Sequence, residues 1–144
     1  MRLTVFTDYA FRVLIYLALD TERRVTIRDV ASGYDISRNH LMKVVNLLTR
    51  AEFVDASRGV NGGLMLARPP DEITLGDVIR HTEEDFALVE CFRPDNRCRI
   101  TPACTLQGIL GEACSAFLEV MDSYTVADLA TKPAALSRLL EIGA

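Results

Sequence analysis

The turn between Gly59 and Gly63 constrains the fold more than any other stretch of the sequence. It contains three glycines and Asn61, and it separates two short apolar runs, residues 53–54 and 64–66. Glycine and asparagine readily adopt the positive φ values that tight hairpin turns need, so the stretch predicts two antiparallel strands. A bare hairpin would be purely structural, and its function therefore depends on what precedes it.

Two amphipathic helices are predicted immediately before this hairpin. Residues 27–33 follow an N-cap at Thr26, and Gly33 is expected to end the helix. Ser37 is expected to cap a longer helix that reaches about residue 50. Two short helices joined by a tight turn are typical of a helix-turn-helix, and the hairpin after them is then its wing.

The second of these helices is expected to turn polar side chains toward DNA. Its candidate DNA contacts are Ser37, Arg38, Asn39, His40 and Lys43. Asn suits adenine edges, whereas Arg and Lys suit guanine or phosphate. In the wing, Arg58 is expected to enter a minor groove, and the backbone amides of Asn61 and Gly62 to meet phosphate. Any solvated amphipathic helix shows a similar stripe, so the wing is what favours the DNA-binding interpretation.

The distribution of charge agrees with a nucleic-acid partner, although the total does not. The chain has a net charge of −4. Residues 1–70 carry ten basic and seven acidic side chains, and residues 71–144 carry six and thirteen. A basic front half can meet phosphates, and an acidic back half suggests a separate task.

Three cysteines, Cys91, Cys98 and Cys104, lie within fourteen residues that are rich in turn formers. Thiolates bind iron–sulfur clusters and also zinc. Zinc sites and thiol-redox sites usually contain a C-x-x-C pair, which this stretch lacks. Three unconnected buried thiols are a further alternative, but two of these cysteines lie among charged residues. The spacing favours a cluster and leaves a zinc or thiol-redox module open.

The remaining helices flank this cysteine loop. Residues 7–20 predict a first helix capped by Thr7, with Asp8 in its first turn, where a carboxylate suits the helix dipole. A short helix starts after Thr74, and the acidic residues 83–85 behind it are expected to be a solvated face. Residues 105–123 predict a long helix. Its apolar residues step in heptads and predict a dimer: Leu106, Leu110, Ala113, Phe117, Val120 and Tyr124.

Several classes of protein are excluded or disfavoured. The apolar stretch 9–19 is too short to span a bilayer, so no membrane partner is expected. Four cysteines without a secretory leader indicate a reducing, cytoplasmic location. The sequence has no phosphate-binding glycine loop, catalytic triad order or metalloprotease motif, and an enzyme is therefore not expected. Cys114, beside the heptad seam, is interpreted as a packing residue.

Four motifs together resemble the NsrR branch of a family of winged-helix iron–sulfur regulators that also includes IscR and RirA. They are the run 37–43, the wing 58–63, the cysteine run 98–104 and the stretch 124–129. The resemblance covers nearly the whole chain. It implies a mainly α-helical fold with a small β-hairpin wing: a winged helix-turn-helix (1–80), a cysteine-bearing cluster loop (81–104), and a long dimerisation helix with C-terminal helices (105–144).

The resemblance also implies a function. It implies a homodimeric transcription repressor that binds double-stranded operator DNA and senses nitric oxide through a 4Fe–4S cluster. The cluster is held by Cys91, Cys98 and Cys104, with Asp8 of the partner subunit as the fourth ligand. The approach to the first cysteine, residues 85–91, is also similar to RirA. An iron- or redox-responsive regulator of the same family is therefore the alternative.

Overall fold

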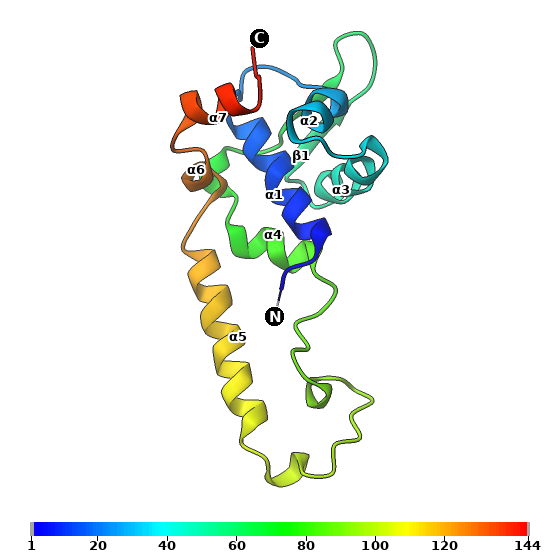
Figure 1. Cartoon of the computed structure of the whole chain (residues 1–144), viewed down its shortest axis with the longest axis vertical. Coiled ribbons are helices and arrows are strands. Elements are labelled where there is room, and N and C mark those ends of the chain that lie inside the picture. The colour runs from blue at the N-terminus through cyan, green and yellow to red at the C-terminus, as the bar shows by residue number, and fades with distance from the viewer. Residues whose placement is uncertain (1, 144) are drawn as a thin grey trace.

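The computed structural model describes residues 2–143, which form a helical body and one protruding helix (Figure 1). The helices are α1 (Val5–Ala18), α2 (Ile27–Tyr34), α3 (Arg38–Arg50), α4 (Leu75–Thr82), α5 (Leu106–Asp122), α6 (Val126–Leu129) and α7 (Pro133–Leu139). The strands are β1 (Val54–Ser57) and β2 (Gly63–Leu66), and short 3-10 turns cover Pro70–Glu72, Glu90–Phe92 and Thr101–Ala103. The predicted fold class, mainly α with a β-hairpin wing, is confirmed.

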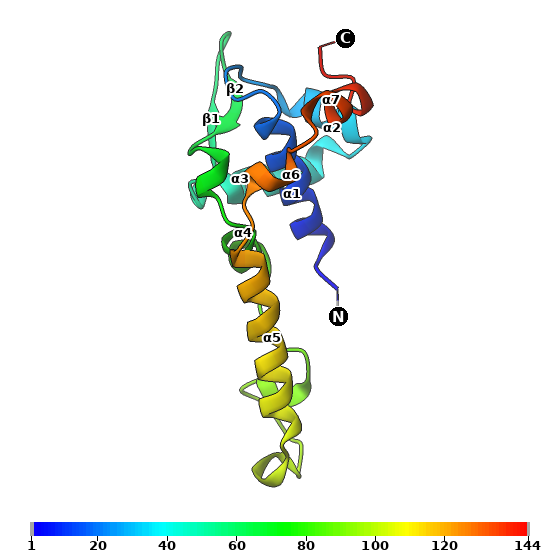
Figure 2. The same cartoon turned by 90° about the vertical axis from the view of Figure 1, so that its left-hand side faces the viewer.

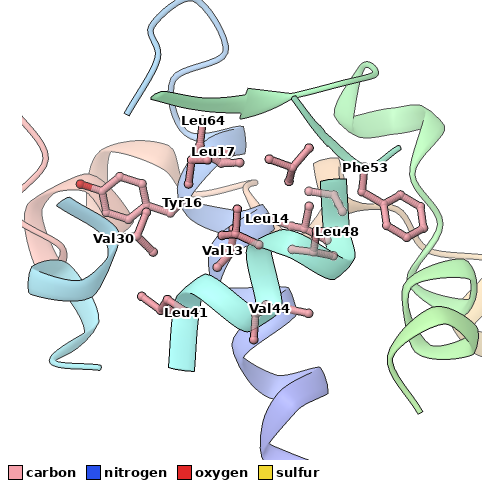
Figure 3. Packing of buried hydrophobic residues seen from close by; sticks show 14 of the residues in the cluster. Val13, Leu14, Tyr16, Leu17, Val30, Leu41, Val44, Leu48, Phe53 and Leu64 are labelled. Atoms are coloured by element: carbon pink, nitrogen blue, oxygen red, sulfur yellow. The ribbon is translucent and has the colours of Figure 1, made fainter. Parts of the chain in front are cut away.

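Helix α1 is the centre of the body, and α2, α3, α4 and α6 surround it (Figure 1). Its fully buried residues Val13 and Leu14 face Leu41 and Leu48 of α3 (Figure 3). Burying a side chain of this size stabilises the fold by roughly 1.5–3 kcal/mol. The predicted apolar stripe of α3 is therefore buried, and its opposite face is free for other contacts.

The hairpin is antiparallel, with Val54 opposite Leu66 and Ser57 opposite Gly63. Val54 and Leu64 are buried, so the base of the hairpin packs on the helices. The connector between α1 and α2 lies beside β2, where Val25 and Leu64 form an isolated antiparallel bridge.

Helix α5 extends away from the body, and none of its residues is buried (Figures 1 and 2). The C-terminal end of α5 is fixed to α4, because Arg80 of α4 forms two hydrogen bonds, of 2.6 and 2.7 Å, with the carboxylate of Asp122, the last residue of α5. Gly76 of α4 leaves room for that carboxylate: a Cβ there would lie 1.8 Å from Asp122 Oδ1. The chain then returns to the body, where Val126 N donates to Ile73 O.

Two predicted helix ends are wrong. The first helix starts at Val5, and Thr4 is its N-cap, since its hydroxyl accepts from the Thr7 amide at 3.3 Å. Thr7 is instead a buried residue within the helix. The second helix passes Gly33 and ends at Tyr34, with Asp35 in the left-handed conformation. Gly33 is needed for close packing, because a Cβ there would lie 3.0 Å from the Tyr16 ring.

Within residues 2–143, no helix is both long enough and apolar enough to cross a membrane.

Candidate functional site

The polar stripe predicted on the second helix of the pair lies on the open side of α3. Arg38, Asn39, His40 and Lys43 are exposed, and so is Met42, while Leu41 is buried. Ser37 is the N-cap by position, but its side chain makes no capping hydrogen bond, which leaves its hydroxyl free to bond elsewhere. The helix therefore presents amide, imidazole and cationic groups to the solvent.

The wing tip presents Arg58 and Asn61, both exposed, to the solvent. The amide of Gly62 already donates to the Gly59 carbonyl at 3.0 Å, inside the turn. A Cβ at Gly62 would lie 2.5 Å from the Ser57 carbonyl oxygen, so the tight turn requires glycine there. Of the two predicted amide contacts to phosphate, the one from Asn61 is open in this conformation.

The three cysteines of the loop lie between α4 and α5 and are all free thiols. Cys98 is exposed, and Cys91 and Cys104 are half-buried. Within residues 2–143 of this single chain, no three Cys, His, Asp or Glu side chains are grouped as metal ligands. The sequence places the thiols on one loop, but the isolated chain does not bring them together as a finished site.

Three residues that sequence reasoning missed organise this loop. Asn96 Oδ1 accepts from the Cys98 amide at 2.9 Å, and the Thr101 hydroxyl donates to the Cys98 carbonyl at 2.9 Å. Gln107, in the first turn of α5, donates from its amide nitrogen to the Cys91 carbonyl at 2.7 Å. These bonds hold the backbone and leave the sulfur atoms free. Asn side chains often accept from the backbone amide two residues further on, and Asn96 was therefore the available sequence signal.

Asp8 lies in the first turn of α1, as predicted, and its side chain is half exposed. It forms an ion pair with Arg12 one turn later, at 2.8 Å. The Arg12 guanidinium carbon also lies 5.7 Å from the ring centroids of Tyr9 and Tyr34. Burial raises the pKa of Tyr34 to about 12, although Arg12 opposes the rise, so the hydroxyl stays protonated.

Glu83, at the exit of α4, connects the start of the cysteine loop with the start of α1. Its Oε1 accepts from the Thr4 amide at 2.7 Å, from the Thr4 hydroxyl at 3.0 Å and from the Thr7 hydroxyl. Burial alone raises the pKa of Glu83, but these hydrogen bonds together outweigh it and hold the pKa below its usual value. The prediction that residue 83 belongs to a solvated acidic face is therefore wrong.

His81 and Cys114 make contacts outside the cysteine loop and the DNA-binding surface. His81 lies edge-on to the Phe53 ring, with centroids 5.1 Å apart, and its Nδ1 is 2.8 Å from the Asp77 carbonyl oxygen. Cys114 is half-buried on α5 and lines a cavity of about 360 Å³ with Leu3 and Phe117.

The chemistry of the loop donors fits an iron–sulfur cluster. Three free thiols are available on one loop whose backbone is held by side-chain hydrogen bonds. Thiolates are the ligands such clusters take, and a fourth position can come from another residue type. At this loop the chain would supply three thiolate ligands to such a cluster.

The chain is similar to known transcription regulators along most of its length. The model of the Rrf2 family, described as an iron-dependent transcriptional regulator, matches residues 3–132. The HTH-type transcriptional regulator NsrR of Geobacillus kaustophilus is 48% identical over 143 residues, which cover 98% of this chain and 97% of that protein. The regulator of the same name from Bacillus licheniformis is 46% identical over 142 residues, with coverage of 97% and 99%.

Solved structures show the same similarity in three dimensions. CymR, the global cysteine regulator of B. subtilis, superposes with a TM-score of 0.73 at 31% identity, covering 91% of this chain and 97% of that one. IscR of T. potens superposes with a TM-score of 0.71 at 25% identity, covering 90% and 85%. The similarity thus includes the helical body, the wing and the long helix.

Proposed function

The chain belongs to the Rrf2 family of iron-dependent transcriptional regulators, and on that premise we propose that it is a homodimeric repressor that senses nitric oxide through an iron–sulfur cluster. Membership of this family makes it a DNA-binding regulator of transcription, not an enzyme. The finer assignment is supported by curated relatives named NsrR at 46–48% identity. The proposed place of action is the cytoplasm, where thiols stay reduced.

The observation that carries the proposal is the set of three free thiols on one loop between α4 and α5. Cys91, Cys98 and Cys104 are all at least partly accessible, and none is paired in a disulfide. We assign them as the thiolate ligands of a 4Fe–4S cluster. When bound, the cluster supplies iron that nitric oxide attacks.

Asp8 is the proposed fourth ligand, and it would serve the cluster of the partner subunit. A carboxylate is a hard ligand and the weakest match to a sulfur-rich cluster. Asp8 must also leave the ion pair with Arg12 to reach a metal, unless the second carboxylate oxygen is used. Asp8 would therefore be the weakest of the four proposed ligands.

Helix α5 is the proposed dimerisation helix. Leu106, Ile109 and Val120 are each at least half exposed, and none of the seventeen residues of α5 is buried. An apolar helix face of this length is stable in water only when it is covered, and a second copy of α5 offers a matching heptad seam. A dimer also gives two DNA-binding modules for the two halves of a palindromic operator.

The proposed operator-binding surface combines α3 with the wing. Helix α3 presents Arg38, Asn39, His40 and Lys43, and Ser37 stands at its start. The wing adds Arg58, Asn61 and Gly62. In the proposed domain organisation, residues 1–80 form the DNA-binding module, residues 81–104 the cluster loop and residues 105–144 the dimerisation region. Losing the cluster frees the loop, and the two modules then lose the spacing that the operator requires.

An anaerobic absorbance spectrum tests the proposal. The purified protein is expected to show a broad visible band. Replacing Cys91, Cys98 or Cys104 with Ser is expected to abolish the band, because each change removes one thiolate. Cys114→Ser is the matched control and is expected to keep it. A colourless wild-type protein that contains zinc would contradict the proposal, and equal loss with Cys114→Ser would contradict the ligand assignment.

A further inference from the structure

The wing is held at its base by Arg24, a residue of the connector between α1 and α2. Its Nη1 donates to the Gly63 carbonyl at 3.2 Å, and its Nη2 forms an ion pair with the Asp55 carboxylate. Asp55 belongs to β1, and Gly63 is the first residue of β2. One side chain thus connects both strands of the wing to the helical body.

The backbone beneath Arg24 brings the connector and the wing into close contact. Val25 and Leu64 exchange two backbone hydrogen bonds, of 3.0 and 2.7 Å, and both residues are buried. Gly63 has a φ of +147°, and a Cβ there would lie 2.9 Å from the Val25 carbonyl oxygen and 3.1 Å from Arg24 Cβ. Only glycine allows this approach, which is what places Gly63 within reach of the guanidinium.

The tip of the wing extends beyond this base into solvent. Residues 58–61 are all exposed, and Val60 is completely so. The Gly62 amide bonds within the turn itself, to Gly59. The direction in which Arg58 points is therefore set by the two strands below it, and those strands are held by Arg24.

Arg24 also compensates a charge that is unfavourable for DNA binding. The Asp55 side chain is half exposed on a strand that leads to the proposed DNA-contacting tip. An unpaired carboxylate near the phosphate backbone would weaken binding through repulsion. The Arg24 side chain is less exposed than that of Asp55, since it lies under the wing.

From these contacts we infer that Arg24 is a positioning residue for operator binding: it fixes the wing through Asp55 and Gly63 and does not itself contact DNA. The inference rests on the proposed DNA-binding surface and is independent of the cluster. It assigns a role to the α1–α2 connector, which lies outside the recognition helix and the wing.

A double-mutant cycle tests this role. The variants are Arg24→Gln, Asp55→Asn and the two together, each measured against a duplex selected from random sequence with the wild-type protein. Arg23→Gln is the matched control, because Arg23 lies in the same connector, carries the same charge and pairs locally with Asp20 at 3.2 Å. Arg24→Gln is expected to weaken binding by about two- to fivefold relative to Arg23→Gln, the range of a partly exposed ion pair.

The mechanism predicts how the effect depends on Asp55. In the Asp55→Asn background, Arg24→Gln is expected to cost less than in the wild-type background, because the ion pair is already gone and only the hydrogen bond to the Gly63 carbonyl remains to be lost. The slope of log K against log salt is expected to be the same for Arg24→Gln and Arg23→Gln. In hydrogen exchange without DNA, the Leu64 amide is expected to exchange faster in Arg24→Gln than in the control.

Two results would overturn the inference. In one result, Arg24→Gln weakens duplex binding as much in the Asp55→Asn background as in the wild-type background, and the slope of log K against log salt falls by about one. That result would mean that Arg24 contacts a phosphate directly. Equal affinity of Arg24→Gln and Arg23→Gln would mean that the Val25–Leu64 bridge alone holds the wing. The Arg58→Ala variant distinguishes this outcome from an error in the proposed DNA-binding surface. If Arg58→Ala also binds the duplex with normal affinity, the wing does not contact DNA.

Discussion

The hydroxyl of Thr7 donates a hydrogen bond to the carboxylate of Glu83, across 76 positions of sequence. Thr7 is completely buried in α1, and Glu83 is the first residue after α4. The Thr7 hydroxyl has one hydrogen and two acceptors within reach, the Glu83 carboxylate and the Thr82 hydroxyl at 2.8 Å, and the charged carboxylate is the stronger acceptor. The Thr82 hydroxyl donates its own hydrogen within α4, to the Val78 carbonyl, also at 2.8 Å. This group joins the start of α1 to the entrance of the cysteine loop.

Replacing Thr7 with Val is expected to lower the free energy of unfolding by about 1–3 kcal/mol. The change keeps the shape of the side chain and leaves the Glu83 carboxylate without one of its donors. Urea unfolding measures the effect, with Glu84→Gln, at an exposed neighbouring carboxylate, as the control expected to change little. Equal stability of Thr7→Val and wild type would show that the bond to Glu83 adds nothing.

The same group predicts a dependence of stability on pH. The folded-state pKa of Glu83 is lowered, so its carboxylate stabilises the fold fully above its ordinary pKa of 4.5. That contribution is lost as the pH falls through the lower, folded-state pKa. The stability difference between wild type and Glu83→Gln is expected to be constant from pH 6 to 7, because this pH range lies about two units above the ordinary pKa of a glutamate. It is expected to shrink steadily below pH 4.5, and a pH-independent difference in urea unfolding would contradict this.

The helix-turn-helix and wing could be predicted from sequence because their determinants are local. The apolar spacing of α3 and the glycine-rich turn are both contained in short windows. The start of α1 was misplaced because Thr4 and Thr7 both precede apolar residues at helical spacing. In the structure Thr4 is the N-cap, because Thr7 lies inside the body and contacts Glu83 there.

The candidate site was less predictable, because its parts are distant in sequence or belong to other molecules. The role of Glu83 depends on a contact across 76 positions, and no local pattern distinguishes it from Glu84. The ion pair of Asp8 with Arg12 follows the i,i+4 spacing and was available from sequence. In the proposed site the three thiols converge only on a cluster and with a second chain, so neither the sequence nor the single chain contains that arrangement.

Sequence-specific binding is expected to depend on the exposed start of α3. Arg38→Ala and Asn39→Ala should each cost about 1–3 kcal/mol of operator binding and relax base choice, because each removes a base-edge contact. Arg138→Ala, on α7, is the control for loss of one exposed charge. Affinities from titration against operator and random duplex measure both effects. Unchanged specificity in both α3 variants would place base recognition elsewhere.

Self-association is expected to depend on the exposed apolar face of α5. Leu106→Glu and Val120→Glu place a charge where a partner helix would bury it, and each should convert the dimer to a monomer at micromolar concentration. Leu139→Glu, at an even more exposed leucine of α7, should leave the dimer intact. Sedimentation velocity distinguishes the two states. Dimers in all three variants would show that α5 is not the interface.

Asp8 is expected to influence the cluster and not only the helix. Asp8→Ala should retain a cluster on three thiolates, alter its circular dichroism and change the rate of reaction with nitric oxide. Arg12→Gln removes the same ion pair but keeps the carboxylate, so its cluster spectrum should match wild type. If Asp8 had only a helix-dipole role, worth about 0.3–1 kcal/mol, its loss would alter stability alone. Stopped-flow nitrosylation then would not distinguish Asp8→Ala from wild type.

The most direct test of the central claim is operator binding by cluster-loaded protein, measured anaerobically before and after stoichiometric nitric oxide. A repressor that senses nitric oxide is expected to bind tightly before exposure and to lose at least tenfold in affinity afterwards, equivalent to about 1.4 kcal/mol. Cys98→Ser, which lacks one proposed thiolate ligand, should bind weakly throughout. Operator binding that is equally tight with cluster, without cluster and after nitric oxide would contradict the account.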